Sequence, residues 1–199
     1  MTDKTADTGI NERIATRVRG LRTGLGLTLD ALAARSGVSR SALSQIERAQ
    51  TSATAVVLDR LAVGLGVTLS SLFEPAEGRA APAPLVRRAE QLLWRDPGSG
   101  YLRRSVSPPN VTSPVRIVEV EFPPGARVAY EAGARDPIVH QQIWMLDGSI
   151  AFTHGETTWR LEAGDCLAVR LDAPTAFRNP TRKPARYAVV VACEVAVRR

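Results

Sequence analysis

Residue types that build covalent or metal-based cores are scarce in this sequence. Its 199 residues include two cysteines, Cys166 and Cys193, which lack the short spacing of a metal-binding pair. No positively charged, apolar leader stands at the N-terminus, and no apolar run approaches the about 20 residues of a membrane-spanning helix. These absences predict a soluble protein of a reducing compartment, and we expect the cytoplasm.

Charge of either sign is not concentrated in any part of the chain. The formal net charge is +6, and the composition, 44% hydrophobic and 23% charged, is typical of a globular protein of one or two domains. Through Pro75 nine Lys/Arg stand against seven Asp/Glu, and the remainder has seventeen against thirteen. The basic balance favours a polyanionic partner, but its even distribution excludes a basic tail. Contacts with such a partner must come from locally placed side chains.

The first part of the chain has helical periodicity. Across residues 10–73 apolar residues recur at helical spacing, which predicts five short helices. Residues 1–9 are polar and aperiodic and predict a disordered tail, whereas residues 74–84 hold three prolines and predict an interdomain linker. Hydroxyl side chains that precede the periodic runs are expected to cap the helices: Thr28, Ser39, Thr54 and Thr68.

Residues 85–199 change to two-residue alternation and short apolar runs, which predict strands. Asp147-Gly148 and His154-Gly155-Glu156 are expected to form hairpin turns between neighbouring strands. Several short strands at this spacing indicate a small barrel or jelly roll. The predicted strands are residues 115–122, 138–146, 149–153, 157–161, 166–171 and 186–197, with 101–107 as an additional one.

Residues 28–48 predict two short helices joined by a tight turn. Leu32 and Ala33 face the core from the first helix, Gly37 permits the turn, and Leu43 and Ile46 anchor the second helix. The exposed face of the second helix carries short or hydrogen-bonding side chains, as a helix that enters the DNA major groove requires.

Residues 14–73 resemble the lambda repressor-like helix-turn-helix regulators of the XRE family. The matching segments are residues 18–22, 32–33, 36–39, 44–48 and 61–67. The resemblance implies an N-terminal five-helix lambda-repressor-like DNA-binding domain over residues 10–73 that reads double-stranded operator DNA. The positions that it assigns to base reading are Ser39, Arg40, Ser41, Ser44 and Gln45, with Arg40 suited to guanine and Gln45 to adenine. The positions that it assigns to phosphate contact are Thr28, Arg48, Thr51 and Ser52.

The sequence departs from the family pattern near the end of the second helix. Ala49 stands where a glycine commonly ends the recognition helix, and Ala53 stands where a proline commonly follows. Leu29 replaces a residue that is often polar. The alternative to DNA binding is that the helical domain is a protein-interaction module whose charged face is only solvated.

Residues 85–199 resemble a cupin, an all-β jelly-roll barrel domain. The segments that carry the resemblance are residues 122–125, 143–148, 161–165 and 177–179. Metal-dependent cupins hold their metal with histidines and a glutamate, but here Gln141 stands at the glutamate position and Thr175 at the second-motif histidine. Neutral glutamine and threonine do not form a tight transition-metal site, so we expect no metal and no catalytic residues.

The two histidines and two cysteines have ordinary interpretations. His140 neighbours Gln141 on a strand, so it points out of the barrel if Gln141 points in, and His154 lies in a hairpin. Cys166 and Cys193 are expected to be buried thiols.

A barrel without metal leaves a mouth that accommodates a small organic effector. The residues expected to line it are Tyr130, Gln141, Ile143, Met145, Thr175 and Phe177. Each has the alternative of simply filling the core of a small barrel. The favoured hypothesis is a homodimeric, sequence-specific transcriptional regulator whose DNA binding responds to that effector. The alternatives are a metal-dependent cupin enzyme with a DNA-binding appendage, and an antitoxin-like regulator that binds a protein.

Overall fold

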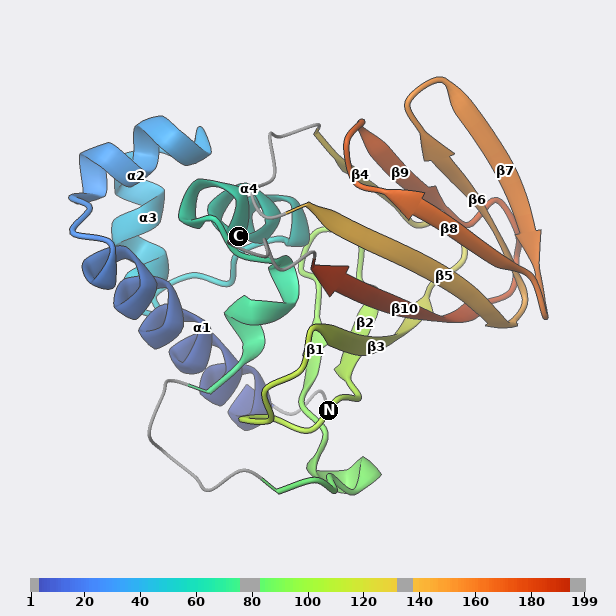
Figure 1. The fold of residues 1–199 in the computed structure, drawn as a ribbon, viewed down its shortest axis with the longest axis horizontal. Coiled ribbons are helices and arrows are strands. Elements are labelled where there is room, and N and C mark those ends of the chain that lie inside the picture. Colours follow the sequence, from blue (N-terminus) through green and yellow to red (C-terminus); the bar gives the residue numbers. More distant parts are fainter. Residues whose placement is uncertain (1–3, 76–82, 132–137, 194–199) are drawn as a thin grey trace, which may run out of the picture.

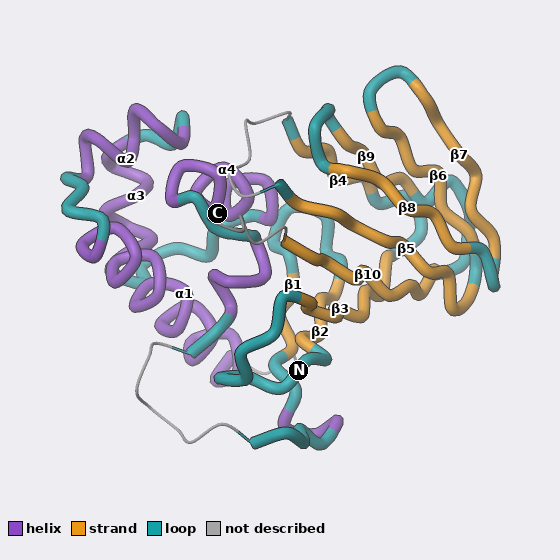
Figure 2. The backbone as a smooth tube through the Cα atoms, viewed as in Figure 1, coloured by secondary structure: helices purple, strands orange, loops and turns teal. Residues whose placement is uncertain are grey.

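The computed structural model describes residues 4–75, 83–131 and 138–193, which form a helical part and a sheet part (Figure 1). Helices gather on one side of the molecule and strands on the other, and α4 lies between them (Figure 2). The residues of the predicted linker at 76–82 lie outside the described residues. Within the described ranges, no helix is long and apolar enough to span a membrane.

The N-terminal part contains four α-helices followed by a short 3₁₀ helix. They are α1 Lys4–Gly24, α2 Leu29–Ser36, α3 Arg40–Glu47, α4 Ala55–Leu65 and η1 Leu69–Phe73. The four predicted caps are confirmed, since each hydroxyl accepts from the backbone amide three residues on: Thr28, Ser39, Thr54 and Thr68. Gly37 ends α2 at φ 66, in the left-handed region that favours glycine.

Two helix predictions differ from the structure. Helix α1 begins at Lys4, so the helix extends six residues before the predicted start and residues 4–9 are not a tail. The predicted fifth α-helix is the 3₁₀ helix η1. Pro75 explains its short length, because a proline removes an amide donor and disfavours the helical conformation at the residue before it.

The C-terminal part contains a 3₁₀ turn and strands in two sheets. The turn is η2 Arg88–Glu90, and the strands are β1 Leu93–Arg95, β2 Leu102–Ser105, β3 Val115–Phe122, β4 Arg127–Tyr130, β5 Val139–Asp147, β6 Ser149–His154, β7 Thr157–Glu162, β8 Cys166–Arg170, β9 Thr175–Arg178 and β10 Ala185–Cys193. The strand predicted at 115–122 is confirmed with the same limits, and four others lie within one residue of their predicted ends. Residues 194–197 of the last predicted strand lie outside the described residues, and β1, β4 and β9 were not predicted.

The sheet order defines a jelly roll, as the sequence predicts. One sheet has the order β1-β2-β3-β10-β5-β8 and the other β4-β9-β6-β7. Strand β3 therefore pairs with β10, β4 with β9, β5 with β8, and β6 with β7. This nested pairing is the jelly-roll arrangement. Gly148, at φ 74 between β5 and β6, is required because a Cβ would lie 2.9 Å from the Pro184 carbonyl oxygen.

The helical and sheet parts share one hydrophobic core. Phe73 of η1 packs on Trp94 of β1 with ring centroids 5.3 Å apart, and Trp94 continues to Tyr101 at 5.8 Å. The backbone amide of Ala55, at the start of α4, donates to a carboxylate oxygen of Asp96 at 2.8 Å. The first turn of α4 is therefore held partly by a residue of the sheet domain.

The cysteine prediction is half wrong. Cys166 is exposed, because it lies on the outer face of β8 opposite the exposed Trp144. Cys193 is partly buried, and burial raises the pKa of its thiol. Both thiols are free.

Candidate functional site

Helix α3 presents one polar face to solvent. Leu43 and Ile46 are buried beneath the helix, so positions 40, 41, 44, 45 and 48 share the opposite face. All nine predicted DNA-contacting residues reach the surface: Thr28, Ser39, Arg40, Ser41, Gln45, Arg48, Thr51 and Ser52 are exposed, and Ser44 is half-buried. The structure thus brings four of the five predicted base-reading residues, Arg40, Ser41, Ser44 and Gln45, together on one helix face, and Ser39 is the N-cap of that helix.

The side chains at the ends of α3 serve local geometry as well. The hydroxyl of Ser39 caps α3 and lies 3.2 Å from that of Ser41. Arg48 donates from Nε to the Ser44 carbonyl oxygen at 3.1 Å. Ser52 accepts a hydrogen bond from the Asn11 amide of α1 at 2.7 Å. These bonds fix the backbone on which the polar face is displayed.

Arg40 stands at the start of α3 with its side chain available for a new partner. Its guanidinium lies 3.1 Å from the Asp30 carboxylate, but the two side chains are 65% and 75% exposed. An ion pair this exposed contributes about 0 to 1 kcal/mol. Breaking this pair would therefore cost little.

A nearly buried ion pair that sequence reasoning missed anchors α3 to α1. Arg22 donates from Nε and an Nη to the two carboxylate oxygens of Glu47, at 2.6 and 2.8 Å, and from its other Nη to the Leu27 carbonyl oxygen. The side chains are only 13% and 8% exposed. The hydrogen bonds to Glu47 raise the pKa of Arg22. No local motif joins residues 25 positions apart, so the pair follows only from the packing.

Ala49, two residues after the end of α3, has a strained backbone conformation. Its φ is 54, in the left-handed region where a Cβ is unfavourable, and the family commonly has glycine at this position. Ala49→Gly is expected to stabilise the protein by about 1 kcal/mol and to raise its Tm by about 2 to 4 °C. Thermal unfolding followed by circular dichroism measures the shift.

The matched control is Ala34→Gly at an exposed position of α2. This change should lower the stability because glycine is unfavourable in a helix interior. Equal destabilisation by both changes would contradict the strain at Ala49.

A cavity of about 90 Å³ lies where the helical domain meets the open end of the jelly roll. Its walls are mostly apolar and come from both domains. The helical domain contributes Asp59 of α4 and Thr68, Leu69 and Ser70 at η1; the jelly roll contributes Tyr101, Arg103, Val118, Val120, Phe122, Val128, Tyr130, Val139, Gln141, Leu171, Thr175, Phe177, Tyr187, Val189 and Val191. The space exceeds that needed by one water molecule.

Four of the six residues predicted to line a ligand site lie on this cavity: Tyr130, Gln141, Thr175 and Phe177. Ile143 and Met145 do not. Both face inward on β5 and are buried in the barrel core, 0% and 1% exposed. The sequence predicts which side chains of β5 point inward. It does not predict which of them line the cavity and which are packed in the core.

Two hydrogen-bond donors mark the polar part of the cavity wall. Arg103 of β2 is 4% exposed and donates to the hydroxyls of Ser105 and Ser70, at 3.2 and 2.8 Å. Its guanidinium carbon lies 4.2 Å from the Phe73 ring centroid. Burial lowers the pKa of Arg103 to about 10, so it stays charged near neutral pH. The second donor is the Gln141 amide nitrogen, which is buried without a hydrogen-bond partner.

The tyrosine hydroxyls of the cavity stay neutral. Burial is the main cause that raises the pKa of Tyr101 to about 12, and it also raises that of Tyr130. The two hydroxyl oxygens lie 3.5 Å apart.

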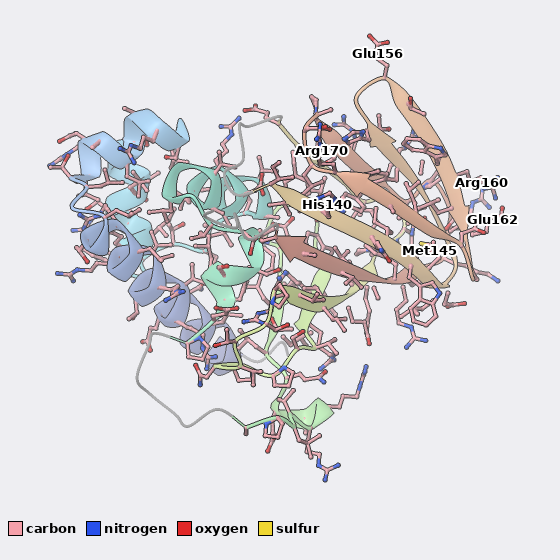
Figure 3. The ribbon with its side chains drawn as sticks, viewed as in Figure 1. His140, Met145, Glu156, Arg160, Glu162 and Arg170 are labelled. Carbon is pink, nitrogen blue, oxygen red and sulfur yellow. The ribbon has the colours of Figure 1, made fainter. Side chains whose placement is uncertain are left out.

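Across the described residues, no cluster of three or more histidine, cysteine or acidic side chains has the arrangement of a metal site. Gln141 and Thr175 line the cavity as neutral groups. His140 lies on the outer face of β5 near Arg170 (Figure 3), as the alternation with Gln141 predicts. The His154 Nε2 atom lies 2.9 Å from the Arg170 carbonyl oxygen and 3.2 Å from Asp172.

Comparison with known proteins assigns the N-terminal part to a family. Residues 18–72 match the helix-turn-helix family HTH_3. The HTH-type transcriptional regulator SutR of Escherichia coli (strain K12) is 38% identical over 64 residues, which are 32% of this chain and 36% of that protein. The chain therefore aligns with about a third of the length of this curated relative.

Solved structures extend the likeness to the whole fold. The crystal structure of an HTH_3 family transcriptional regulator from Vibrio cholerae is 25% identical, covers 95% of this chain and 99% of its own, and has a TM-score of 0.77. A Cupin_2 domain of an XRE family transcriptional regulator from Enterobacter cloacae is 15% identical over 48% of this chain and 98% of its own, with a TM-score of 0.44. The N-terminal domain is thus a helix-turn-helix domain of the XRE type, joined to a jelly roll in the two-domain fold of the Vibrio regulator. The predicted fold class is confirmed, with four α-helices in place of five.

Proposed function

We propose that this protein is a transcriptional regulator that binds operator DNA through α3 and responds to a small molecule in the cavity between its domains. The observation that carries the proposal is the polar face of α3, held out from the core by Leu43, Ile46 and the Arg22–Glu47 pair. Arg40 and Gln45 on that face have the side chains that read guanine and adenine in the major groove. The helix-turn-helix family of residues 18–72 supports the same partner.

The regulator is expected to act as a homodimer. One α3 helix of eight residues reads few base pairs, and helix-turn-helix dimers place two such helices in half-sites about one DNA turn apart. A change in the relative placement of the two helical domains then changes the fit to both half-sites.

The shared cavity supplies the route from effector to DNA. Because Asp59 and Ser70 of the helical domain line it together with the jelly roll, a ligand there contacts both domains at once. Such a ligand shifts the equilibrium only if it binds one arrangement of the domains more tightly than the other.

Arg40→Ala tests the DNA interface. We expect the affinity for DNA selected by the wild-type protein from a random pool to fall by about 10- to 100-fold, because a bidentate base contact carries about 1 to 3 kcal/mol. Titration of labelled duplexes at fixed salt measures the change.

The matched control is Arg160→Ala, which removes the same charge from the far hairpin of the jelly roll (Figure 3), where the side chain is 70% exposed. Equal losses in the two variants would indicate an effect of net charge and would rule out α3 as the reading helix.

The alternative functions make different predictions. A metal-dependent cupin enzyme requires a stoichiometric metal in protein purified without added metal, although Gln141 and Thr175 replace the usual ligands. An antitoxin-like regulator requires a small protein that copurifies tightly. Elemental analysis and mass spectrometry of the purified protein distinguish both from an effector-responsive regulator.

A further inference from the structure

We infer that the interdomain cavity binds a small organic acid, whose carboxylate pairs with Arg103 and which offers an oxygen acceptor to the Gln141 amide. The inference deepens the proposed function and rests on the cavity being its effector site. It names the chemical class of the effector and the residues that select it.

Arg103 is charged and buried without a carboxylate partner. Among the described residues it makes no ion pair, and its guanidinium donates to two serine hydroxyls, which use only part of its five N–H donors. Burying a cation without an anion is unfavourable, and the planar guanidinium matches a carboxylate in geometry. The cavity wall therefore holds a preformed anion-binding group.

Gln141 adds a donor without a hydrogen-bond partner to the same cavity. Gln141 is 8% exposed and lines the cavity, and its Nε2 atom has no hydrogen-bond partner. A buried donor left unpaired is unfavourable. Arg103 and Gln141 both offer N–H donors to the cavity, so a complementary ligand presents acceptors to them.

The remaining wall excludes a highly polar ligand. Much of the lining is apolar: Val118, Val120, Phe122, Val128, Val139, Phe177, Val189 and Val191. A short apolar body fills this space, and its burial adds to the binding free energy. The volume of about 90 Å³ favours a small acid over a nucleotide.

Asp59 and Arg103 both line the cavity, but each borders a different depression beyond it. Asp59 also borders a surface depression with Arg35 and Tyr130. Arg103 instead borders a depression with Phe73 and Ser105. The carboxylate is assigned to the Arg103 side.

Arg103 also links the ligand to the helical domain. Its hydrogen bond to Ser70 and its stacking on Phe73 are both contacts with η1. An acid that draws the guanidinium toward the cavity competes with these contacts. The effector therefore acts on the junction that positions α4 and the helices beyond it.

The first experiment compares acids with their uncharged amides on the full chain. Thermal unfolding is measured with levulinate, isovalerate and benzoate, and with the primary amide of each acid. We expect the acids, levulinate among them, to raise the Tm and their amides to leave it unchanged. Amides that stabilise as well as the acids, or no stabilisation by any acid, would overturn the inference.

The second experiment uses Gln141→Leu, with Gln142→Leu on the exposed face of the same strand as its control. Gln141→Leu should leave the free protein at least as stable, since it removes an unpaired donor, and should weaken levulinate binding by about 10-fold. Gln142→Leu should change neither. Unchanged levulinate affinity in Gln141→Leu would contradict the assigned role of Gln141.

The two proposals fail in different ways. An acid that binds the cavity while DNA affinity stays unchanged upholds the inference and overturns effector control. A neutral compound that changes DNA affinity, when no acid binds, upholds effector control and overturns the inference.

Discussion

Arg22→Ala is expected to destabilise the protein by about 3 kcal/mol or more, since removal of one partner of a buried ion pair costs about 3 to 5 kcal/mol. The variant leaves the Glu47 carboxylate, 8% exposed, with neither of its two guanidinium hydrogen bonds. It also frees the Leu27 carbonyl oxygen in the turn before α2. Urea unfolding followed by helical ellipticity measures the loss, and DNA affinity should fall with it because Glu47 ends α3.

Two comparisons separate the unpaired charge from other effects. Asp30→Ala breaks the exposed pair with Arg40 and should cost no more than about 1 kcal/mol. Arg22→Met combined with Glu47→Leu removes both charges and should recover most of the stability lost in Arg22→Ala. A loss below about 1 kcal/mol in Arg22→Ala would show that the pair does not hold α3 in place.

Phe73→Ala is expected to cost about 3 to 5 kcal/mol and to uncouple the two domains. Phe73 is 3% exposed, packs on Trp94 and carries the Arg103 guanidinium on its ring. Its removal opens a void at the only ring contact that joins η1 to β1 among the described residues. The helical and sheet domains should then unfold in separate steps, seen as non-coincident transitions in helical ellipticity and tryptophan fluorescence.

Phe152→Ala is the matched control, since Phe152 is fully buried in β6 and contacts Phe177 within the barrel. It should destabilise by a similar amount, yet its effect originates away from the interdomain contact. Coincident transitions in Phe73→Ala would contradict the role of Phe73 in coupling the domains.

The elements and faces set by local chemistry follow from the sequence. The hydroxyl caps and the spacing of Leu43 and Ile46 predict α3 and its exposed face before any tertiary contact is known. Strict alternation along β5 predicts that Gln141 points inward and His140 outward. Both predictions use only the repeat of the secondary structure and the burial of apolar residues.

The features that depend on packing between distant segments could not be predicted from the sequence. Arg103 is a charged residue at an inward-facing strand position. The alternation of a strand predicts an apolar residue there, so the pattern does not indicate a binding group. The closure of the cavity by η1 requires the placement of one domain on the other. Cys166 looks buried in its apolar strand, but β8 is the last strand of its sheet and the outer face there is uncovered.

Methylation of guanine N7 in the selected DNA tests the central claim most directly, because this atom lies in the major groove. We expect methylation of one guanine in each half-site to block binding of the wild-type protein. The Arg40→Ala variant, which binds more weakly, should no longer be sensitive to that modification. Interference that is the same in Arg40→Ala as in the wild type, or that is absent from the wild type, would contradict major-groove reading by α3.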